Sequence, residues 1–217
     1  MNRRSLPVAA ALAATAALLL TACGSGDEEP NAKEEIAGVD EGAKKSASPT
    51  PSATESTRRP EIKLPADVTL TFTPEQAGDA VQDAVLKDNA EFIRALNAAI
   101  TAGDPRHPAL GFYTEGEAAV SAEGWVKSFK DAGWTVTGTV RYFDRQVTVK
   151  SKTSASIRYC ADESKGFSKV VKTGEIKGTK ASKNNYIVYG AQVAKTKEGT
   201  WELMKISSTR GAAMCQP

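Results

Sequence analysis

The stretch WTVTGTVRY, residues 134–142, decides the fold class of this 217-residue chain. Its apolar side chains alternate with threonine and arginine, and the same period of two resumes over residues 147–159. This alternation predicts two long strands, each with one face in the core and the other in solvent. A short strand is predicted over residues 167–172, and a hairpin over residues 185–208 with its turn at residues 197–199. The C-terminal half is therefore predicted to form an antiparallel sheet.

The residues before this stretch follow the period of a helix. Apolar side chains recur at three- and four-residue spacing from Ala77 to Ile100, and Gly103 ends the run. Thr73 and Gln76 have the spacing of a capping box, so the pattern predicts that the long helix starts at Thr73.

A second helix is predicted from Thr114 or Glu115 to Gly133, with Trp125 and Phe129 in its apolar stripe. Helices followed by antiparallel strands imply an α+β fold in which one curved sheet wraps the long helix.

The N-terminus is typical of an export signal. Arg3 and Arg4 precede an apolar run over residues 7–20, which is too short to span a bilayer comfortably, since that takes about 20 apolar residues. Residues 1–22 are therefore predicted to be a signal peptide. The following LTAC, residues 20–23, is similar to the lipobox of bacterial lipoproteins, and this resemblance implies a diacylglyceryl group on Cys23 and cleavage before it. Two acyl chains would anchor the chain on the extracytoplasmic face of the cell membrane.

A polar segment follows the cysteine. Residues 24–66 contain no aromatic residue and consist mainly of Ala, Ser, Thr, Pro, Glu and Lys. Such a composition cannot bury enough apolar surface to offset the entropy of ordering. All fourteen aromatic residues lie between Phe72 and Trp201. We therefore expect residues 23–66 to be a lipidated cysteine with a disordered tether, and residues 67–217 to be one folded domain.

Charge is unevenly divided within that domain. Residues 67–140 carry five basic and eleven acidic side chains, whereas residues 141–217 carry fifteen basic and six acidic ones. One interpretation is a dipolar surface that orients the domain near charged polymers or lipids. The other, which we favour, is that Lys and Arg on the strands block edge pairing. The external location and the acidic helical half argue against nucleic-acid binding.

The helices and strands together resemble a known fold. A long helix ending in NAAITAGDP, residues 97–105, a second helix bearing Trp125, and long bent strands resemble the NTF2-like (cystatin-like) α+β cone. The segments YCADESK, residues 159–165, and RGAAMC, residues 210–215, with Trp201, are similar to a group of exported actinobacterial lipoproteins with an NTF2-like domain. The resemblance covers most of residues 73–217 and implies fold and location, not an activity.

Cys160 and Cys215 are the two cysteines left once Cys23 is lipidated. The compartment outside the membrane permits disulfides, and no close-spaced Cys-x-x-Cys redox motif is present. We therefore predict a structural disulfide between them.

No catalytic, metal or cofactor motif is found in the sequence. The single histidine, His107, excludes the common histidine-rich zinc sites, and phosphate loops and dinucleotide fingerprints are absent. The resemblance implies that NTF2-like enzymes use Asp, Tyr or His inside the cone, but none of their motifs matches this chain residue by residue. Asp162 and Glu163 are interpreted as turn-capping groups in a loop. We therefore expect no metal and no cofactor, and assign no catalytic residue.

Several aromatic side chains could line the interior of a cone. For Trp125 and Phe129, burial in the core is the favoured alternative. The candidate lining residues are Tyr113, Trp125, Phe129, Tyr186 and Tyr189.

These observations lead to two functional hypotheses. The first is a lipid-anchored extracytoplasmic module that binds an envelope component, a small apolar ligand or a protein partner. The alternative is a small NTF2-like enzyme, an isomerase, dehydratase or hydrolase that uses a buried Asp or Tyr in the cone.

Overall fold

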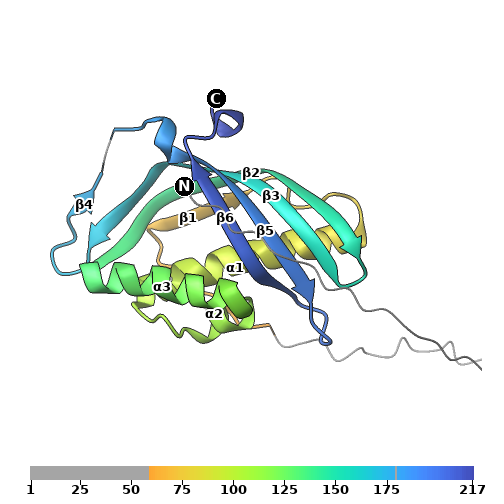
Figure 1. Cartoon of the computed structure of the whole chain (residues 1–217). Coiled ribbons are helices and arrows are strands. Elements are labelled where there is room, and N and C mark those ends of the chain that lie inside the picture. The colour runs from red at the N-terminus through yellow and green to blue at the C-terminus, as the bar shows by residue number, and fades with distance from the viewer. Residues whose placement is uncertain (1–58, 179) are drawn as a thin grey trace, which may run out of the picture. The chain divides into compact units, whose positions relative to one another are not determined.

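The computed structural model describes residues 59–178 and 180–217 (Figure 1). The predicted signal peptide, Cys23 and most of the predicted tether lie outside the described residues. Within the described part, no helix is both long and apolar enough to cross a membrane.

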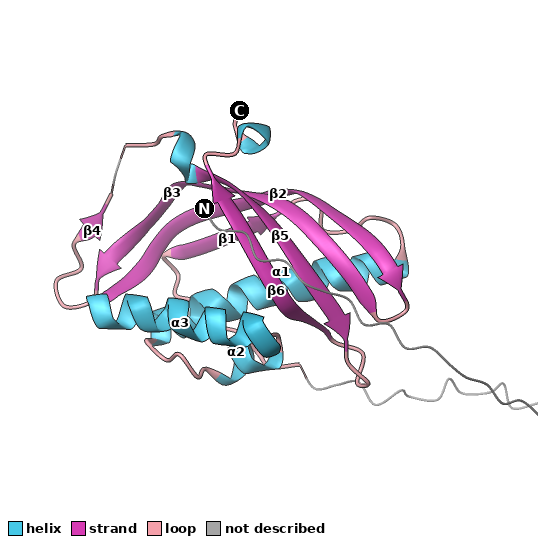
Figure 2. Ribbon diagram, viewed as in Figure 1, coloured by secondary structure: helices cyan, strands magenta, loops and turns pink. Residues whose placement is uncertain are grey.

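One mixed sheet and three α-helices form the described domain (Figure 2). The sheet has the strand order β1-β2-β3-β5-β6, and β4 pairs with the end of β3. The β1–β2 pair is parallel and all the other pairs are antiparallel. The strands are β1 (Val68–Phe72), β2 (Trp134–Ser151), β3 (Ser154–Val170), β4 (Ile176–Lys177), β5 (Tyr186–Lys195) and β6 (Trp201–Arg210).

The helices α1 (Ala80–Ala102), α2 (Pro108–Phe112) and α3 (Gly116–Ala132) cover one face of this sheet (Figure 1). The core lies between the two layers and includes Leu86 and Ile93 from α1 together with Ile157 and Trp201 from the sheet. The predicted α+β class, with N-terminal helices packed on a curved sheet, is confirmed.

Helix α1 begins later than its capping pattern predicts. The N–H of Thr73 donates to the carbonyl of Tyr142, so this residue continues the pairing of β1 with β2 and does not cap a helix. The actual N-cap is Asp79, whose carboxylate accepts from the N–H groups of Val81 and Gln82 at 3.0 Å each. The predicted start at Thr73 is wrong because residues 68–72 form a strand that the pattern did not reveal.

The other helix ends follow local chemistry. Both α1 and α3 stop at a glycine in the left-handed region, Gly103 and Gly133, as predicted. Helix α2 was not predicted. The Nδ1 atom of His107 accepts from the N–H of Ala109 at 3.3 Å, so the single histidine caps this short helix.

The two long strands do not have the predicted bounds. The strand predicted over residues 147–159 is wrong, because a turn at residues 152 and 153 divides it between β2 and β3. The interruption expected between Tyr142 and Val147 is a β-bulge inside one strand, β2, where Asp144 has φ of 49°. The segment 167–172, predicted as a separate strand, begins within the end of β3. Asp162 and Glu163 also belong to β3, so their assignment to a loop is wrong. Pairing with β2 keeps this polar stretch extended.

Close approach of two glycines helps the sheet to curve. Gly138 of β2 has φ of 92° and is paired with Gly166 of β3. A Cβ atom added to Gly138 would lie 2.2 Å from the carbonyl oxygen of Lys165, which no side chain tolerates. Glycine at this position therefore permits the local bend of β2 over the helices.

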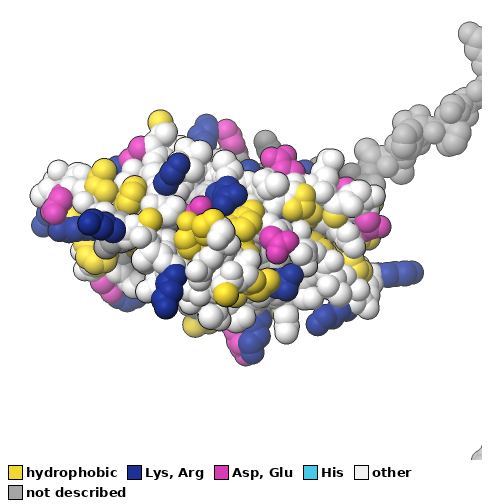
Figure 3. All heavy atoms as spheres, turned by 90° about the horizontal axis from the view of Figure 1, so that it is seen from above, with side chains coloured by type: hydrophobic (Ala, Val, Ile, Leu, Met, Phe, Trp, Pro, Cys, Tyr) yellow, Lys and Arg dark blue, Asp and Glu magenta, His cyan; other side chains and the backbone are white. Residues whose placement is uncertain are grey.

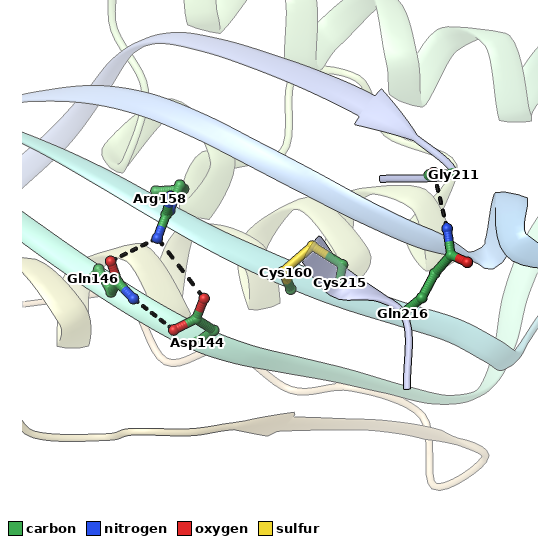
Figure 4. Close-up of a disulfide and its surroundings, with 7 residues drawn as sticks. All are labelled: Asp144, Gln146, Arg158, Cys160, Gly211, Cys215 and Gln216. Carbon is green, nitrogen blue, oxygen red and sulfur yellow. Dashed lines mark hydrogen bonds and ion pairs between the residues drawn. A yellow bond between two sulfur atoms is a disulfide. The ribbon is translucent and has the colours of Figure 1, made fainter. Parts of the chain in front are cut away.

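The C-terminal tail is attached to the sheet by a disulfide between Cys160 and Cys215 (Figure 4). Cys160 lies in β3 between two inward-facing residues, Tyr159 and Ala161, so its own side chain faces away from the helices. Both cysteines are buried. The expected pairing is present, and it fixes the turn η2 (Ala213–Cys215) to the middle of a strand, not to a loop after it.

The sheet face opposite the helices carries Lys and Arg among hydrophobic and acidic side chains (Figure 3). Several of these cations are paired within the domain. Arg141 contacts Asp162 at 3.5 Å, and Arg158 contacts Asp144 at 3.9 Å. Both of these acids belong to the C-terminal half, whereas Lys205 pairs with Glu117 of α3 at 3.3 Å and so offsets part of the basic excess of that half.

Residues before the predicted domain boundary at 67 contact the core. The guanidinium of Arg59 forms an ion pair with the carboxylate of Asp88, with an Nη2–Oδ2 distance of 3.1 Å. Ile62 packs against the hydrophobic core. Arg59 and Ile62 therefore contact the domain, although the composition placed both residues in the tether.

Candidate ligand cavity

A cavity of about 790 Å³ lies between the sheet, the second half of α1, and α3. Its walls are mainly aliphatic and aromatic, and they come from every layer of the domain. Among the lining residues are Leu70, Phe92, Leu96, Ile100, Ala122, Trp125, Phe129, Trp134, Val140 and Ile206. Trp125 and Trp134 are 49% and 41% exposed, so the cavity opens to solvent beside these two rings.

The larger polar side chains form one group in this lining. Glu163 accepts a hydrogen bond from Arg210, with an Nη1–Oε2 distance of 3.1 Å. The charge of Glu163 acts on both Tyr142 and Tyr189, which places the two phenols close to it. Asn97 of α1 lies beside Tyr142. The cavity therefore combines mainly apolar walls with a polar cluster, which we define as Asn97, Tyr142, Glu163, Tyr189 and Arg210. The lining also contains smaller hydroxyl side chains, those of Ser121, Ser128, Thr137, Ser168, Ser207 and Ser208.

Burial changes the acidity of this cluster. It raises the pKa of Tyr142 well above the ordinary value, and the neighbouring Tyr189 acts in the same direction. Burial likewise raises the pKa of Tyr189, and the charge of Glu163 adds to this effect. Both phenols therefore keep their protons at physiological pH and can donate hydrogen bonds.

Glu163 is the titratable carboxyl of the cluster. Burial raises its pKa, whereas the charge and hydrogen bond of Arg210 act in the opposite direction without cancelling that rise. A carboxyl group with a raised pKa holds a proton more readily than one in water. Its oxygen atoms accept hydrogen bonds, as Oε2 does from Arg210.

The predicted pocket residues separate into two groups. Trp125 and Phe129 line the cavity, with their rings edge to face at 5.4 Å, and so does Tyr189, which stacks on Tyr159. Tyr113 is not among the lining residues and is buried in the core. Tyr186 also lies outside the lining, and its carbonyl accepts from the N–H groups of residues 211 and 212.

Four cluster residues were not named as candidates from the sequence. Tyr142 could have been found, because the alternation of residues 134–142 already places it on the inward face. Glu163 could not, since a run of small and charged residues is typical of a turn. Asn97 and Arg210 carry no local signal that distinguishes them from other surface residues.

Residues 59–178 and 180–217 contain no cluster of metal-ligating side chains. No group of three or more His, Cys, Asp or Glu side chains there could hold a metal ion.

Comparisons with known proteins give a distant structural likeness. No protein-family model matches the chain, and no curated protein matches it. Among solved structures, the chain is similar to a ketosteroid isomerase-like protein from Erwinia carotovora atroseptica, with a TM-score of 0.40 and 15% identity over 61% of this chain and 97% of that one. It is also similar to the intermembrane space region of the chloroplast protein ARC6, with a TM-score of 0.39 and 14% identity over 59% of this chain and 97% of that one.

Proposed function

We propose that this domain binds a small, mostly apolar ligand in the cavity between the helices and the sheet. The observation that carries the proposal is a cavity of about 790 Å³ with mainly apolar walls and a cluster of larger polar side chains. Pockets for small molecules typically measure about 300–1,000 Å³ and combine apolar walls with a few convergent polar groups.

The polar cluster indicates what the ligand presents at one end. The hydroxyl groups of Tyr142 and Tyr189 are donors at physiological pH, because burial raises the pKa of each phenol. A carbonyl or hydroxyl oxygen on the ligand would accept from them. Glu163, paired with Arg210, would contribute a further acceptor. The ligand class is therefore an apolar body with one neutral oxygen function.

A lipid anchor would set where this binding takes place. The LTAC motif at residues 20–23 supports attachment of the chain to the extracytoplasmic face of the cell membrane through Cys23. An apolar component of the cell envelope is then the natural source of the ligand. Intact-mass measurement of the native protein tests this: cleavage before Cys23 with a diacylglyceryl adduct is expected, and a retained first 22 residues would contradict it.

Binding is tested with the uncharged fluorescent probe Nile red. Ala122 lines the cavity and is buried, whereas Val120 on the same helix is 73% exposed and does not line it. We expect Ala122→Phe to fill the cavity and weaken probe binding, and Val120→Phe to leave binding unchanged. Equal binding by both variants, with thermal unfolding showing that both are folded, would refute the cavity as the binding site.

The enzymatic alternative has one specific observation in its favour. A carboxyl with a raised pKa lies among phenols inside an open cavity, which is a suitable arrangement for proton transfer. The hypothesis named a buried Asp or Tyr. The lining residues in the described part include no aspartate, so the acid–base group would be Glu163 or one of the tyrosines Tyr142 and Tyr189. Loss of turnover in Glu163→Gln with retained Nile red binding would favour an isomerase or dehydratase over a binding module.

A further inference from the structure

A second cavity lies beside the first half of α1 and shares no lining residue with the large one. It measures about 360 Å³. Its walls contain the three cationic side chains Lys87, Arg94 and Arg145 around the ring of Phe72. The other lining residues are Glu75, Gln76, Asp83, Ala84, Leu86 and Ala90.

Arg145 is the unusual member of this group because it is only 3% exposed. It follows Asp144, whose left-handed backbone in the β-bulge turns the chain so that Arg145 reaches under α1. Its guanidinium donates to the carbonyl of Pro74 at 3.0 Å, to the carbonyl of Leu86, and to the amide oxygen of Asn89 at 3.2 Å. All three acceptors are neutral.

The charge of Arg145 is not matched by a carboxylate. Within residues 59–178 and 180–217 no Asp or Glu oxygen lies within 4.0 Å of its guanidinium nitrogens, and its Nε has no hydrogen-bond partner. Buried charges in proteins are normally paired, because desolvation of an isolated ion costs several kcal/mol. Burial lowers the pKa of Arg145 to about 10, so the group still carries its charge at neutral pH.

A second guanidinium approaches the same ring. The Cζ atom of Arg94 lies 4.7 Å from the Phe72 ring centroid, and that of Arg145 lies 5.1 Å from it. One Nη of Arg94 pairs with Glu91 at 2.8 Å, which leaves its other donors available. Lys87, one turn before Glu91 on α1, adds a third positive charge to the wall.

The two carboxylates in the lining do not neutralise these cations. Asp83 Oδ1 accepts from the N–H groups of Ala77 and Gly78, at 2.6 and 3.2 Å, so it holds the turn before α1. Glu75 is exposed to solvent. Glu91 pairs with Arg94, and Glu75 acts on Arg145 through its charge but without an ion-pair contact, so the most buried cation has no carboxylate within 4.0 Å.

We propose that this cavity binds a small molecule through an oxyanion, with Arg94 and Lys87 at its entrance and Arg145 at its base. Guanidinium groups donate to carboxylate and phosphate oxygens through two parallel N–H groups, which is why arginine is favoured in such sites. The anion supplies the counter-charge that Arg145 lacks within the described chain. The site is separate from the proposed apolar ligand cavity.

Calorimetric titration of the full chain with inorganic phosphate and with acetate, at constant ionic strength in chloride, tests the proposal. We expect saturable binding of at least one of the two anions, and the one that binds identifies phosphate or carboxylate as the preferred group. We also expect the same anion to raise the midpoint of thermal unfolding, since a ligand that binds only the folded state stabilises it. Absence of saturable binding by both anions would overturn the proposal.

Three charge-neutralising variants give this test its control. Arg94→Gln should weaken binding of the anion by about tenfold or more, as expected for loss of a charge-assisted contact. Lys87→Gln should weaken anion binding to a smaller extent. Lys130→Gln, on the exposed side of α3, should leave the affinity for the anion unchanged. If all three variants titrate alike, the binding is a general effect of net charge and the site is wrong. Nile red binding should be the same in all of them, which separates this result from the proposed function.

Discussion

The two halves of α1 face different interiors. The first half carries Asp88, which is fully buried and contacts both Arg59 and the N–H of Trp201, at 2.8 Å from the latter. The second half carries Leu96 and Ile100, which border an open cavity of about 790 Å³. The first half therefore carries a buried ion pair beside the smaller cavity, and the second half borders the larger cavity. We infer that stability depends mainly on the first half and ligand binding on the second.

The largest effect on stability is expected for the ion pair between Arg59 and Asp88 in the first half of α1. Arg59→Ala leaves the carboxylate of Asp88 buried without its cation, which should lower the free energy of unfolding by about 4 kcal/mol. Urea denaturation measures this change. Lys63→Ala is the matched control in the same segment, because Lys63 pairs with Glu61 in solvent, and it should change stability by less than about 0.5 kcal/mol. Equal effects would show that the Arg59 contact is not formed.

Two leucines on α1 compare the halves directly. Leu86 borders the smaller cavity but is fully buried in the core, whereas Leu96 is only half-buried, so Leu86→Ala should cost about 3 kcal/mol. Leu96 already borders an empty cavity, so Leu96→Ala removes fewer contacts and should cost about 1 kcal/mol. Chemical denaturation of both variants measures the loss in the free energy of unfolding. A cost for Leu96→Ala as large as that for Leu86→Ala would mean that the second half is as tightly packed as the first.

At the opening of the cavity, a substitution should affect ligand binding more than it affects stability. Trp125 is half exposed and contacts Phe129, so Trp125→Ala should reduce stability by only about 1 kcal/mol. The same variant should clearly weaken Nile red binding, because it removes one of the two tryptophan rings beside the opening. A variant with wild-type probe affinity would place the binding surface elsewhere.

The smallest effect concerns the pH dependence of stability. Burial raises the pKa of Glu163 in the folded state, so folding favours the protonated carboxyl despite the opposing effect of Arg210. This contribution is complete below the unfolded pKa of about 4.3 and is lost as the pH rises through the folded value. Glu163→Gln should therefore remove a decline in the urea midpoint that wild type shows as the pH rises above 4. The opposite slope in wild type would mean that Arg210 dominates.

Residues close together in the sequence were sufficient to predict most of the helices and strands. Gly103 and Gly133 end their helices as predicted, because each adopts the left-handed conformation that favours glycine. The turn at residues 197–199 joins β5 and β6 as expected. By contrast, Thr73 and Asp79 both have side chains suited to helix capping, and only the pairing of Thr73 with Tyr142 decides between them.

The chemistry of the cavity could be anticipated only in part. Trp125 and Phe129 were candidates from helical spacing alone, although the spacing could not distinguish a core from a cavity wall. Glu163 was missed because its neighbours look like a turn. Its position next to Tyr142 and Tyr189 results from the antiparallel register of β3 with β2 and β5, which joins residues far apart in the chain.

The sequence alone determined the periods of the helices and strands, because these depend on residue type and near neighbours. It also identified the two cysteines that pair, because residues 67–217 contain only Cys160 and Cys215. The tertiary structure decided where β1 lies, how the bulge at Asp144 directs Arg145 under α1, and which carboxyl faces the large cavity. The physical reason is that strand register and burial arise from contacts between distant segments. A short window of sequence contains no information about such contacts.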